Sequence, residues 1–523
     1  MGVGSGGLES GAGLLHRLTS YVPEREWDVP LSDPRVLVDF VANNEERWPW
    51  PVKRHDSGLA RVALPRELPG SEAPALAVLA GVGGVGDGGG DGSGGGGKSS
   101  ATPVDLPGLS RLLHLTAGVV RTTQRAPFGT FLFRAAGSAG GRFPLEFYVA
   151  VPEGEASRAL PPGVHWYDPV EHALVLIGPP PAGPGAPTIA VTGVPWRTGW
   201  RYAERGFRHV YWDAGTALSQ LLALSDSVGY EPRLYTRFPD AAVAELVGAD
   251  GTHEWPVAVV TLGPGAPAIE AAAPGVVGLI DGDPLEFPLV TAAQHAGDTD
   301  QLGAPWPVGA PVEVPISVEL TLDEVILKRT SQRRMDPSHG LPAQTLRTSL
   351  ALALRGIDVE HWVAVHKVDG MTPGIYRLPD LDEPLRTATE EWMRAELHRV
   401  CLDQALARDA AFVVMATADV ARLSDREYRE AQLAAGIVEG RLHLAAYALG
   451  ASATGMTFID SEVPALLSGT ETVEHAETVE NAEAAAESVG ALLFTCVGVP
   501  GNTSKPGGAP GAPTQVRRVS PKE

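Results

Sequence analysis

The chain has 523 residues, 44% of them hydrophobic, and a formal net charge of −22 at pH 7. Its length exceeds the roughly 250–300 residues that a single hydrophobic core usually spans, so two structural units are expected. The acidic charge disfavours nucleic acid and anionic membrane surfaces as partners, because no local cluster of Lys and Arg offsets it.

Two cysteines, Cys401 and Cys496, are too few for a disulfide framework or a multi-cysteine metal site. They are expected to be buried thiols in a reducing compartment. Residues 1–15 are expected to be disordered, since their start is rich in Gly and Ser and lacks the basic and apolar regions of a secretion signal. No apolar run is long enough to span a membrane. The sequence therefore predicts a cytoplasmic protein without a bound metal.

Glycine-rich, proline-rich and acidic stretches divide the chain. Residues 81–103 are nearly all Gly, Asp and Ser at their centre and predict a disordered loop, and residues 501–523 predict a disordered tail. Residues 263–315 predict a connector. The repeat V-E-H-A-E-T-V-E-N-A-E within residues 470–488 is interpreted as a solvated acidic insertion. The resulting domains are residues 16–262 and residues 316–500.

The two domains share a pattern that indicates duplication of one unit. Each has an aromatic residue before V-A-V, at Tyr148 and Trp362, then a Pro-Gly loop and a second aromatic segment. Each also has an apolar helical run that opens at Ala-Gly, and a closing strand, at residues 257–262 and 491–497. This order predicts an α+β fold whose two central helices are buried, one against the other. Glycines with a common spacing are Gly215, Gly229 and Gly248 in the first domain and Gly436, Gly450 and Gly469 in the second.

Residues 92–99 match the P-loop expression G-x-x-x-x-G-K-S. A P-loop needs a strand before it and a helix that begins at the Lys-Ser pair, so that backbone N–H groups converge on phosphate. Here a Gly/Asp tract precedes the match, and Pro103 and Pro107 follow it. We interpret the match as a consequence of glycine-rich composition.

A second candidate for phosphate binding is K-R-T-S-Q-R-R at residues 328–334, after a predicted helix or strand at residues 320–327. Guanidinium groups form bidentate, charge-assisted hydrogen bonds to phosphate, and hydroxyl groups add neutral donors. A solvated basic patch is the alternative interpretation of these residues alone. The candidate ligands are Arg329, Thr330, Ser331 and Arg333.

The segment R-A-A-G-S-A-G-G-R-F-P-L-E at residues 134–146 leads into a predicted strand. Its small residues allow a planar ring to approach the backbone, whose N–H groups can donate to nitrogen and oxygen atoms of the ring. Any glycine-rich strand entry would look similar in isolation. The candidate ring contacts are Arg134, Ala136, Gly137, Ser138, Ala139 and Gly140.

Two catalytic candidates, Arg201 and Tyr202, lie in G-W-R-Y-A-E-R-G-F-R, ahead of W-D-A-G at residues 212–215. Tyr202 is a candidate acid or base, or alternatively an aromatic residue that packs under the loop. Arg201 cannot act as a base at neutral pH, because its guanidinium group stays protonated, but it can orient a substrate or stabilise an anion.

Together these segments resemble the nitroreductase superfamily, and in particular its SagB/ThcOx-type dehydrogenases, over about residues 16–498. R-T-S-Q-R is similar to the R-x-S-x-[RK] segment that holds the FMN phosphate and ribityl chain. Residues 134–146 are similar to R-x-x-P-S-A-G-x-x-x-P-L-E, with Gly137 in place of Pro. Arg201 stands where that branch has the Lys of a catalytic Lys-Tyr pair. The loop that nitroreductases place beside flavin N5 corresponds to Gly455, Met456, Thr457 and Phe458.

The resemblance implies two tandem nitroreductase-like units that pack as an intramolecular pseudo-dimer. Nitroreductases are homodimers with FMN in the interface. Here the first unit has the Ser-Ala-Gly loop without R-x-S-x-R, and the second has R-x-S-x-R without that loop, so one FMN per chain is the hypothesis.

The implied activity is oxidation of azoline heterocycles in a ribosomal peptide, with hydride transfer to flavin N5 and a cyclodehydratase as partner. Two alternatives remain open at this point. One is an NAD(P)H-dependent nitro- or quinone reductase that acts on a small molecule. The other is a flavin-free scaffold of a peptide-modifying complex.

Overall fold

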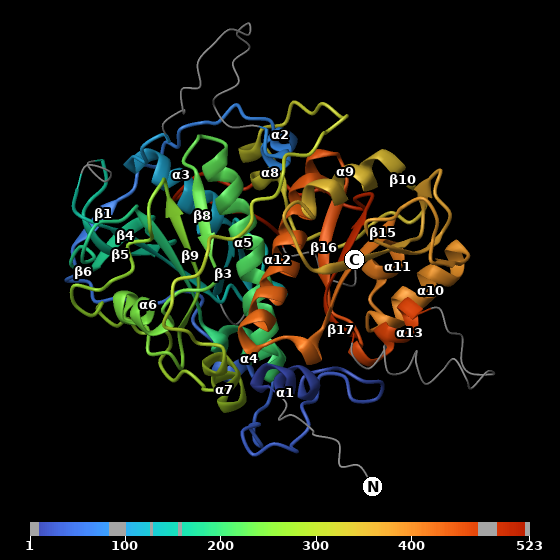
Figure 1. Cartoon of the computed structure of the whole chain (residues 1–523), viewed down its shortest axis with the longest axis horizontal. Helices are drawn as coiled ribbons and strands as arrows, with labels where there is room; N and C mark the ends of the chain where they lie inside the picture. Colours follow the sequence, from blue (N-terminus) through green and yellow to red (C-terminus); the bar gives the residue numbers. More distant parts are fainter. Residues whose placement is uncertain (1–9, 83–100, 126–128, 155–158, 469–488, 518–523) are drawn as a thin grey trace, which may run out of the picture.

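The computed structural model describes residues 10–82, 101–125, 129–154, 159–468 and 489–517. Two α+β units lie side by side, and the helices α5 (Gly206–Asp226) and α12 (Asp425–Ala448) lie between their sheets (Figure 1). The P-loop-like residues 92–99 and the acidic stretch 470–488 are outside the described residues.

Each unit is built on an antiparallel sheet. In the first sheet the strands are β1 Arg61–Ala63, β4 Leu145–Val151, β5 Gly163–Asp168, β6 Ala173–Gly178, β7 Thr188–Gly193, β8 Pro232–Tyr235 and β9 Trp255–Leu262. In the second they are β11 Glu360–Val365, β13 Gly374–Arg377, β14 Arg386–Thr387, β15 Phe412–Asp419, β16 Ser452–Met456 and β17 Val489–Gly498. The order β5-β4-β7-β9-β8 in the first sheet matches β13-β11-β15-β17-β16 in the second. This common topology supports duplication of one unit.

Helices follow the same correspondence. α5 connects β7 to β8 as α12 connects β15 to β16, and α2, α3 and α6 have counterparts in α8, α9 and α13. The α+β fold expected from the sequence is confirmed. The remaining bounds are α1 Gly11–Leu18, α2 Ala75–Ala80, α3 Leu106–Ala117, α4 Pro195–Tyr202, α6 Asp240–Val247, α7 Pro288–Ala296, α8 Leu322–Lys328, α9 Ala343–Ala353, α10 Glu390–Val400, α11 Ala405–Asp409, α13 Val463–Ser468, and the paired strands β10 Leu341–Pro342 and β12 Val368–Asp369.

The central helices cross with their backbones in contact. A Cβ atom on Gly215 would overlap the backbone of Leu433 and Ile437, and one on Gly436 would overlap the backbone of Trp212. Glycine is required at both positions because any side chain would push the helices apart. Buried residues of both units, such as Leu218 and Ile437, belong to one hydrophobic cluster. The predicted packing of one central helix on the other is thus observed.

The helix starts differ from the sequence expectation. The Ala-Gly pairs were expected to open the two helical runs, yet α5 begins at Gly206 and α12 at Asp425, so both pairs lie inside their helices. In α12, polar residues in the first turns hide the helical pattern from the sequence, and Ser424 caps the helix in a capping box with Glu427. The glycines mark the crossing point, and the helices begin upstream of it.

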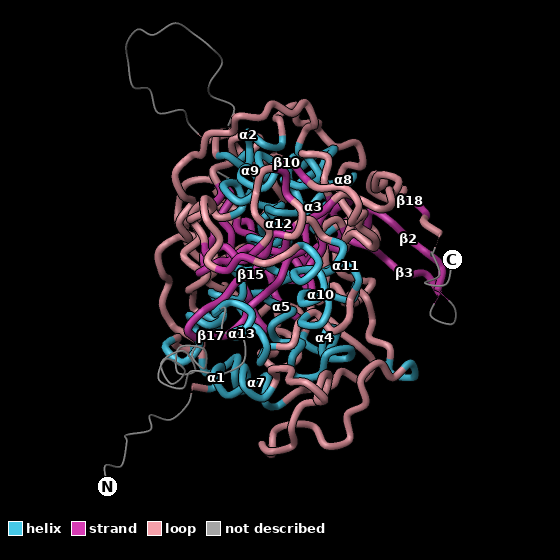
Figure 2. The backbone as a smooth tube through the Cα atoms, turned by 90° about the vertical axis from the view of Figure 1, so that its right-hand side faces the viewer, coloured by secondary structure: helices cyan, strands magenta, loops and turns pink. Residues whose placement is uncertain are grey.

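Described residues near both chain ends form regular structure that was not expected. Residues 11–15, predicted to be disordered, lie in α1, where the N–H of Ala12 donates to Asp425 Oδ1 at 2.6 Å. In the predicted tail, β18 (Thr514–Gln515) pairs in parallel with β2 (Val119–Arg125), which pairs with β3 (Gly129–Arg134). Figure 2 shows this small sheet at the edge of the body. Composition does not predict β18, because its hydrogen bonds come from β2, an edge strand that is distant in sequence.

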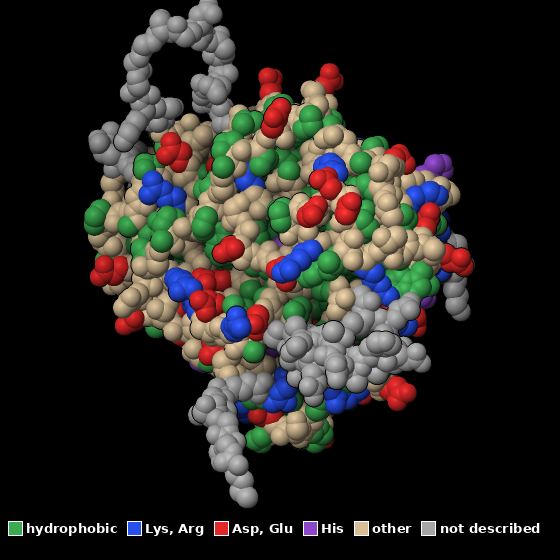
Figure 3. All heavy atoms as spheres, turned by 45° about the vertical axis from the view of Figure 1, so that its right-hand side comes forward, with side chains coloured by type: hydrophobic (Ala, Val, Ile, Leu, Met, Phe, Trp, Pro, Cys, Tyr) green, Lys and Arg blue, Asp and Glu red, His purple; other side chains and the backbone are tan. Residues whose placement is uncertain are grey.

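Charged side chains are interspersed on the face seen in Figure 3, where acidic groups surround scattered Lys and Arg side chains. Among the described residues, no helix is long and apolar enough to cross a membrane. The described ranges also contain no group of three or more His, Cys, Asp or Glu side chains arranged to hold a metal ion. Cys401 and Cys496 are free and buried, as expected.

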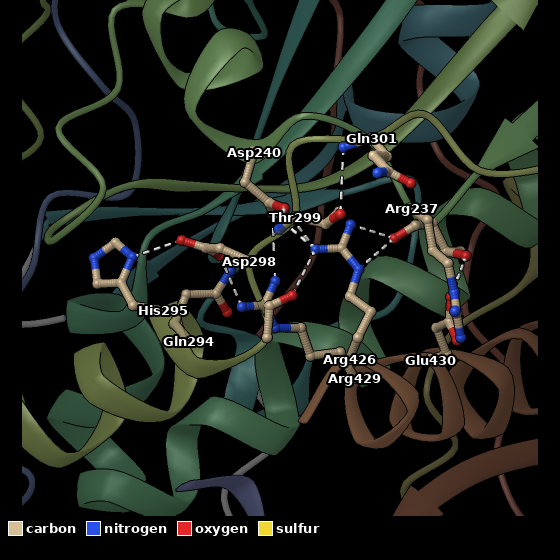
Figure 4. Close-up of polar contacts among 12 residues, drawn as sticks. Arg237, Asp240, Gln294, His295, Asp298, Thr299, Gln301, Arg426, Arg429 and Glu430 are labelled. Atoms are coloured by element: carbon tan, nitrogen blue, oxygen red, sulfur yellow. Dashed lines mark hydrogen bonds and ion pairs between the residues drawn. The ribbon is translucent and has the colours of Figure 1, made fainter. Parts of the chain in front are cut away.

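A buried ion-pair cluster joins the units at the start of α12 (Figure 4). Arg426 Nη1 lies 2.9 Å and 2.8 Å from the two carboxylate oxygens of Asp240 in α6. Arg429 contacts Asp240 at 3.4 Å and Asp298 at 2.9 Å. The predicted connector, residues 263–315, therefore contains a helix, α7. It is tied to the second unit through Asp298 and to the first unit through Thr299, whose N–H donates to Asp240 at 2.9 Å.

The crossing predicts a specific loss of stability. Gly215→Val should lower the free energy of unfolding by about 1–3 kcal/mol, because the added side chain overpacks the contact between α5 and α12. Urea unfolding measures the change. Gly70→Val is the matched control, since no atom lies within 4 Å of a Cβ placed on this exposed glycine. Equal stability of the two variants would contradict the packing assignment.

Candidate functional site

Arg329 is a buried cation with unused donors. It follows α8, which begins at a capping box formed by Thr321 and Glu324. Its side chain is 3% exposed, and Nη2 donates to the carbonyl oxygen of Ala135 at 2.6 Å. Nε and Nη1 have no hydrogen-bond partner. Burial lowers the pKa of Arg329 to about 10, so the group stays protonated at neutral pH. A buried guanidinium group with unpaired N–H groups has the donors that an anion needs, which makes Arg329 a candidate anion ligand.

The phosphate candidates and the small-residue loop come together across the two units. A Cβ atom placed on Gly137 would lie 3.3 Å from Arg329 Nη1 and 3.8 Å from Ser331 Oγ. Thr330 is engaged elsewhere, with its hydroxyl oxygen 3.1 Å from Tyr447 Oη. Arg333 is exposed and forms no hydrogen bond or ion pair with the described residues. The structure therefore joins Arg329, Ser331 and Gly137, whereas Thr330 points to Tyr447.

The backbone around Arg329 is held by residues that the sequence did not single out. Arg121 on β2 donates from Nη1 to the carbonyl oxygen of Arg329 at 3.2 Å and from Nη2 to that of Leu327 at 2.5 Å. Its Nε donates to the carbonyl oxygen of Lys505 at 3.2 Å, and the N–H of Gly507 donates to Leu327 at 2.7 Å. The ordered part of the tail thus supports the candidate anion site.

The small-residue loop is fixed at both ends. Arg134 donates from Nη1 to the carbonyl oxygen of Leu145 at 2.8 Å and from Nη2 to that of Pro51 at 3.0 Å. Its side chain therefore holds the backbone of the loop in place. The N–H of Ala136 donates to Thr116 at 3.1 Å. Gly140 has a φ of +58°, a conformation that glycine adopts without strain.

Asp213, near the start of α5, organises the centre of this loop. It accepts hydrogen bonds from Ser138 Oγ at 2.5 Å and from the N–H of Ala139 at 2.9 Å. The N–H groups of Gly137 and Ser138 remain without an acceptor among the described residues. Burial raises the pKa of Asp213 well above its ordinary value, and the charge of Glu439 on α12 adds to the shift. Sequence reasoning missed both acids, although an acid inside an apolar helix was a visible signal.

Tyr202 and Arg201 lie against the same loop. A Cβ atom on Gly140 would lie 2.7 Å from Arg201 Cδ and 2.8 Å from Tyr202 Oη. The Tyr202 ring stacks on His209, with ring centroids 3.9 Å apart and planes at 13°. Burial raises the pKa of Tyr202, and neighbouring Arg201 opposes the shift. Arg201 is exposed and donates to Asn43 Oδ1 at 3.3 Å.

Asp460 connects the Tyr202 segment to the second unit. Arg205 and Arg208, which belong to the G-W-R-Y-A-E-R-G-F-R segment, each place Nη1 2.7 Å from an oxygen of the buried Asp460 carboxylate. The N–H of Tyr21 donates to the same carboxylate at 2.8 Å. Both arginines therefore tie the segment to Asp460 of the second unit.

The segment expected to form a loop beside flavin N5 differs in conformation. Gly455 and Met456 belong to β16, an edge strand that pairs with β17, and only Thr457 and Phe458 follow it. Phe458 is buried against Phe494, with ring centroids 4.3 Å apart. A Cβ atom on Gly455 would overlap Glu439 Oε1, so this glycine approaches the acid that lies near Asp213. The expectation of a loop was wrong for the first two residues, because ladder pairing with β17 extends the strand.

The pseudo-symmetric position is built differently. There Gly81 follows α2 as Arg329 follows α8, and a Cβ on Gly81 would lie 2.7 Å from Arg355 Nη1. Arg355 donates to the carbonyl oxygen of Leu79 at 3.1 Å and to that of Gly309 at 3.3 Å. Gly356 packs directly on Gly309 of the connector. Arg355 and the connector thus fill the position that is related by pseudo-symmetry to the site of Arg329 and Gly137.

Comparison with known proteins places the fold. No protein-family model and no curated protein matches the sequence. A protein from Anabaena variabilis described as a nitroreductase aligns with 94% of this chain and 100% of its own, with a TM-score of 0.66 and 22% identity. A Ralstonia eutropha protein of the same description aligns with 42% of this chain and 95% of its own, with a TM-score of 0.30 and 20% identity. The first likeness extends over both units and establishes a nitroreductase-like fold.

Burial of Asp213 predicts a pH-dependent contribution to stability. Its folded-state pKa is raised above the ordinary 3.8, so this contribution is full below that pH and is lost as pH rises through the folded-state pKa. In Asp213→Asn the side chain cannot titrate. The free energy of unfolding should therefore fall less steeply with rising pH above about pH 4 than in the wild type.

Urea unfolding at a series of pH values measures this slope. Asp382→Asn is the matched control, because the Asp382 side chain is 89% exposed and its loss should leave the slope unchanged. Identical slopes for Asp213→Asn and the wild type would refute the assignment.

Proposed function

We propose that the chain is an FMN-dependent oxidoreductase with one active centre, built from both units. The observation that carries this proposal is the buried Arg329, whose Nε and Nη1 lack partners beside Ser331 and Gly137. The nitroreductase-like fold supports it, because proteins of that fold hold FMN between two such units. The site has the same composite character, with Arg329 from one unit and Gly137 from the other.

The residues fit the parts of FMN. Arg329 and Ser331 supply charged and neutral donors for the phosphate. The free N–H groups of Gly137 and Ser138 are donors for a ring edge, and the absence of a side chain at Gly137 leaves the approach open. Asp213 holds the loop in this conformation through Ser138 and Ala139.

Bound FMN would supply a two-electron acceptor that takes a hydride from the substrate. The chain supplies the proton chemistry. Tyr202 carries a hydroxyl group beside Gly140 and is the candidate that holds or moves a proton at Oη. Arg201, exposed next to it, stabilises negative charge on the substrate.

A single centre is supported by the pseudo-symmetric position. Gly81 offers no guanidinium group in place of Arg329, and Arg355 fills the place of the small-residue loop. Contact between Gly356 and Gly309 closes this place further. We therefore infer one FMN per polypeptide.

The proposed reaction is oxidation of an azoline heterocycle in a ribosomal peptide, with a cyclodehydratase as partner. Its support is the combination of the Ser-Ala-Gly loop with Tyr202 and Arg201 at one place, the pattern that resembles SagB-type dehydrogenases. Reduction of a small nitro compound or quinone by NAD(P)H is the alternative outcome of the tests below.

Removal of the phosphate ligands should strip the flavin. Arg329→Ala combined with Ser331→Ala should weaken FMN binding by about tenfold to a hundredfold, because a charge-assisted and a neutral hydrogen bond are lost. Flavin absorbance of the purified protein measures occupancy. Arg347→Ala with Ser338→Ala, at two exposed positions of the same unit, is the matched control. Unchanged occupancy in the first variant, or two FMN per wild-type polypeptide, would overturn the site as described.

A substitution at Tyr202 distinguishes a role in proton transfer from a role in packing. Tyr202→Phe keeps a ring on His209 but removes Oη, so turnover of an azoline-containing peptide should fall by about 10²–10⁴-fold with normal FMN content. Mass spectrometry of the product follows the loss of two hydrogens. Tyr376→Phe, which removes a hydroxyl group bonded to Thr372 in the second unit, is the control. Unchanged turnover would assign Tyr202 to packing, and rapid flavin bleaching by NAD(P)H without peptide would favour the reductase.

A further inference from the structure

A small cavity lies directly beside the candidate site. Its volume is about 90 Å³, and it opens between the end of the small-residue loop, β3 and the segment at residues 48–51. Aromatic rings and two buried guanidinium groups, those of Arg142 and Arg197, dominate its wall. The lining includes Trp48, Pro51, Thr130, Phe131, Gly141 and Arg142.

Arg142 is held in this wall by aromatic rings and not by a carboxylate. Its side chain is 7% exposed, and Cζ lies 4.3 Å from the ring centroid of Trp48 and 4.8 Å from that of Trp200. Nε has no hydrogen-bond partner. Among the described residues, no Asp or Glu forms an ion pair with Arg142. A cation–π contact compensates a buried charge only in part, so an unpaired donor remains available.

Further positive charge converges on the same place. Arg125 lies over the Trp48 ring with Cζ 5.2 Å from the centroid. Burial first, and then the charges of Arg201 and Arg125, lower the pKa of Arg142 to about 10. Repulsion among these positively charged groups is relieved when an anion binds beside Arg142.

The cavity adjoins the proposed reaction site. Gly141 and Arg142 continue the loop whose preceding residue, Gly140, approaches Tyr202 Oη and Arg201 Cδ. Arg201 does not line the cavity, but it lies close enough to Arg142 for its charge to lower the pKa of Arg142. A molecule with its reactive part at Tyr202 could place a short charged arm on Arg142.

We propose that this cavity binds a carboxylate group of the substrate, through Arg142 and with the support of Arg125 and Arg201. The volume suits a carboxylate with a short apolar part, and the rings of Trp48 and Phe131 receive that apolar part. The bidentate geometry of a guanidinium group matches a carboxylate. Assignment of this anion to the substrate rests on the proposed function, whereas binding of the anion does not.

Benzoate is the probe, because it combines a carboxylate with a flat apolar ring. Quenching of tryptophan fluorescence in the full-length protein reports its binding near Trp48 and Trp200. Arg142→Gln should weaken benzoate binding on the order of tenfold or more, since a charge-assisted hydrogen bond is lost. Arg386→Gln is the matched control, because Arg386 lies over Trp392, with Cζ 4.2 Å from the ring centroid, away from the cavity.

A second variant guards against misfolding of the first. Thr130 is exposed at the edge of the cavity, so Thr130→Glu adds a carboxylate there and should weaken benzoate binding without disturbing the core. Circular dichroism verifies the fold of each variant. Benzoate binding equal to wild type in folded Arg142→Gln and Thr130→Glu would overturn the proposal, as would absence of benzoate binding to the wild type. Displacement of benzoate by an equal concentration of inorganic phosphate would overturn the carboxylate assignment.

Flavin absorbance separates this proposal from the proposed function. A chain that binds benzoate through Arg142 but holds no flavin refutes the oxidoreductase and leaves the anion cavity in place. A flavoprotein that binds benzoate equally well with and without Arg142 refutes the cavity alone.

Discussion

The contact between Gly215 and Gly436 sets the geometry on which the rest of the molecule depends. Because neither residue has a side chain, the backbones of α5 and α12 touch, and the register of one helix against the other is fixed at that point. Asp213 precedes Gly215 by half a turn, and Glu439 follows Gly436 by nearly one turn. Both acids therefore reach the composite site from the crossing itself. A looser contact would separate the loop held by Asp213 from the strand approached by Glu439.

From this constraint follows a division of labour between the units. In a symmetric pair each unit would supply both a cationic segment and a small-residue loop. Here Arg329 faces Gly137 at one place, and Gly81 faces Arg355 at the other, so the second unit supplies the cationic side chain at both places and the first unit supplies a glycine. A buried guanidinium group must have a partner. Arg355 finds its partners in backbone carbonyls, whereas Arg329 keeps two nitrogens unpaired for a ligand.

Local sequence patterns predicted much of the fold and part of the candidate site. The repeat of glycine spacings indicated two equivalent units, and the segments around Ser331 and Ser138 stood out by composition. Asp213 and Arg121 did not, because their roles depend on hydrogen bonds to residues distant in sequence. The order of the tail had the same origin, since its partner is a strand nearly 400 residues away, as the pairing of Thr514 with Arg121 requires.

The net negative charge of the chain reflects its surface, whereas the candidate site is locally positive. The chain carries −22 overall, yet the small-residue loop is flanked by Arg329 on one side and Arg142 on the other. Screening at physiological ionic strength limits the reach of exposed charges to about 8 Å, whereas buried pairs are screened much less. The acidic surface therefore governs distant encounters with polyanions, whereas buried Arg329 and Arg142 act on a charged group only at close range. An acidic surface is therefore compatible with a buried anion-binding centre, because the surface carboxylates and the buried guanidinium groups act over different distances.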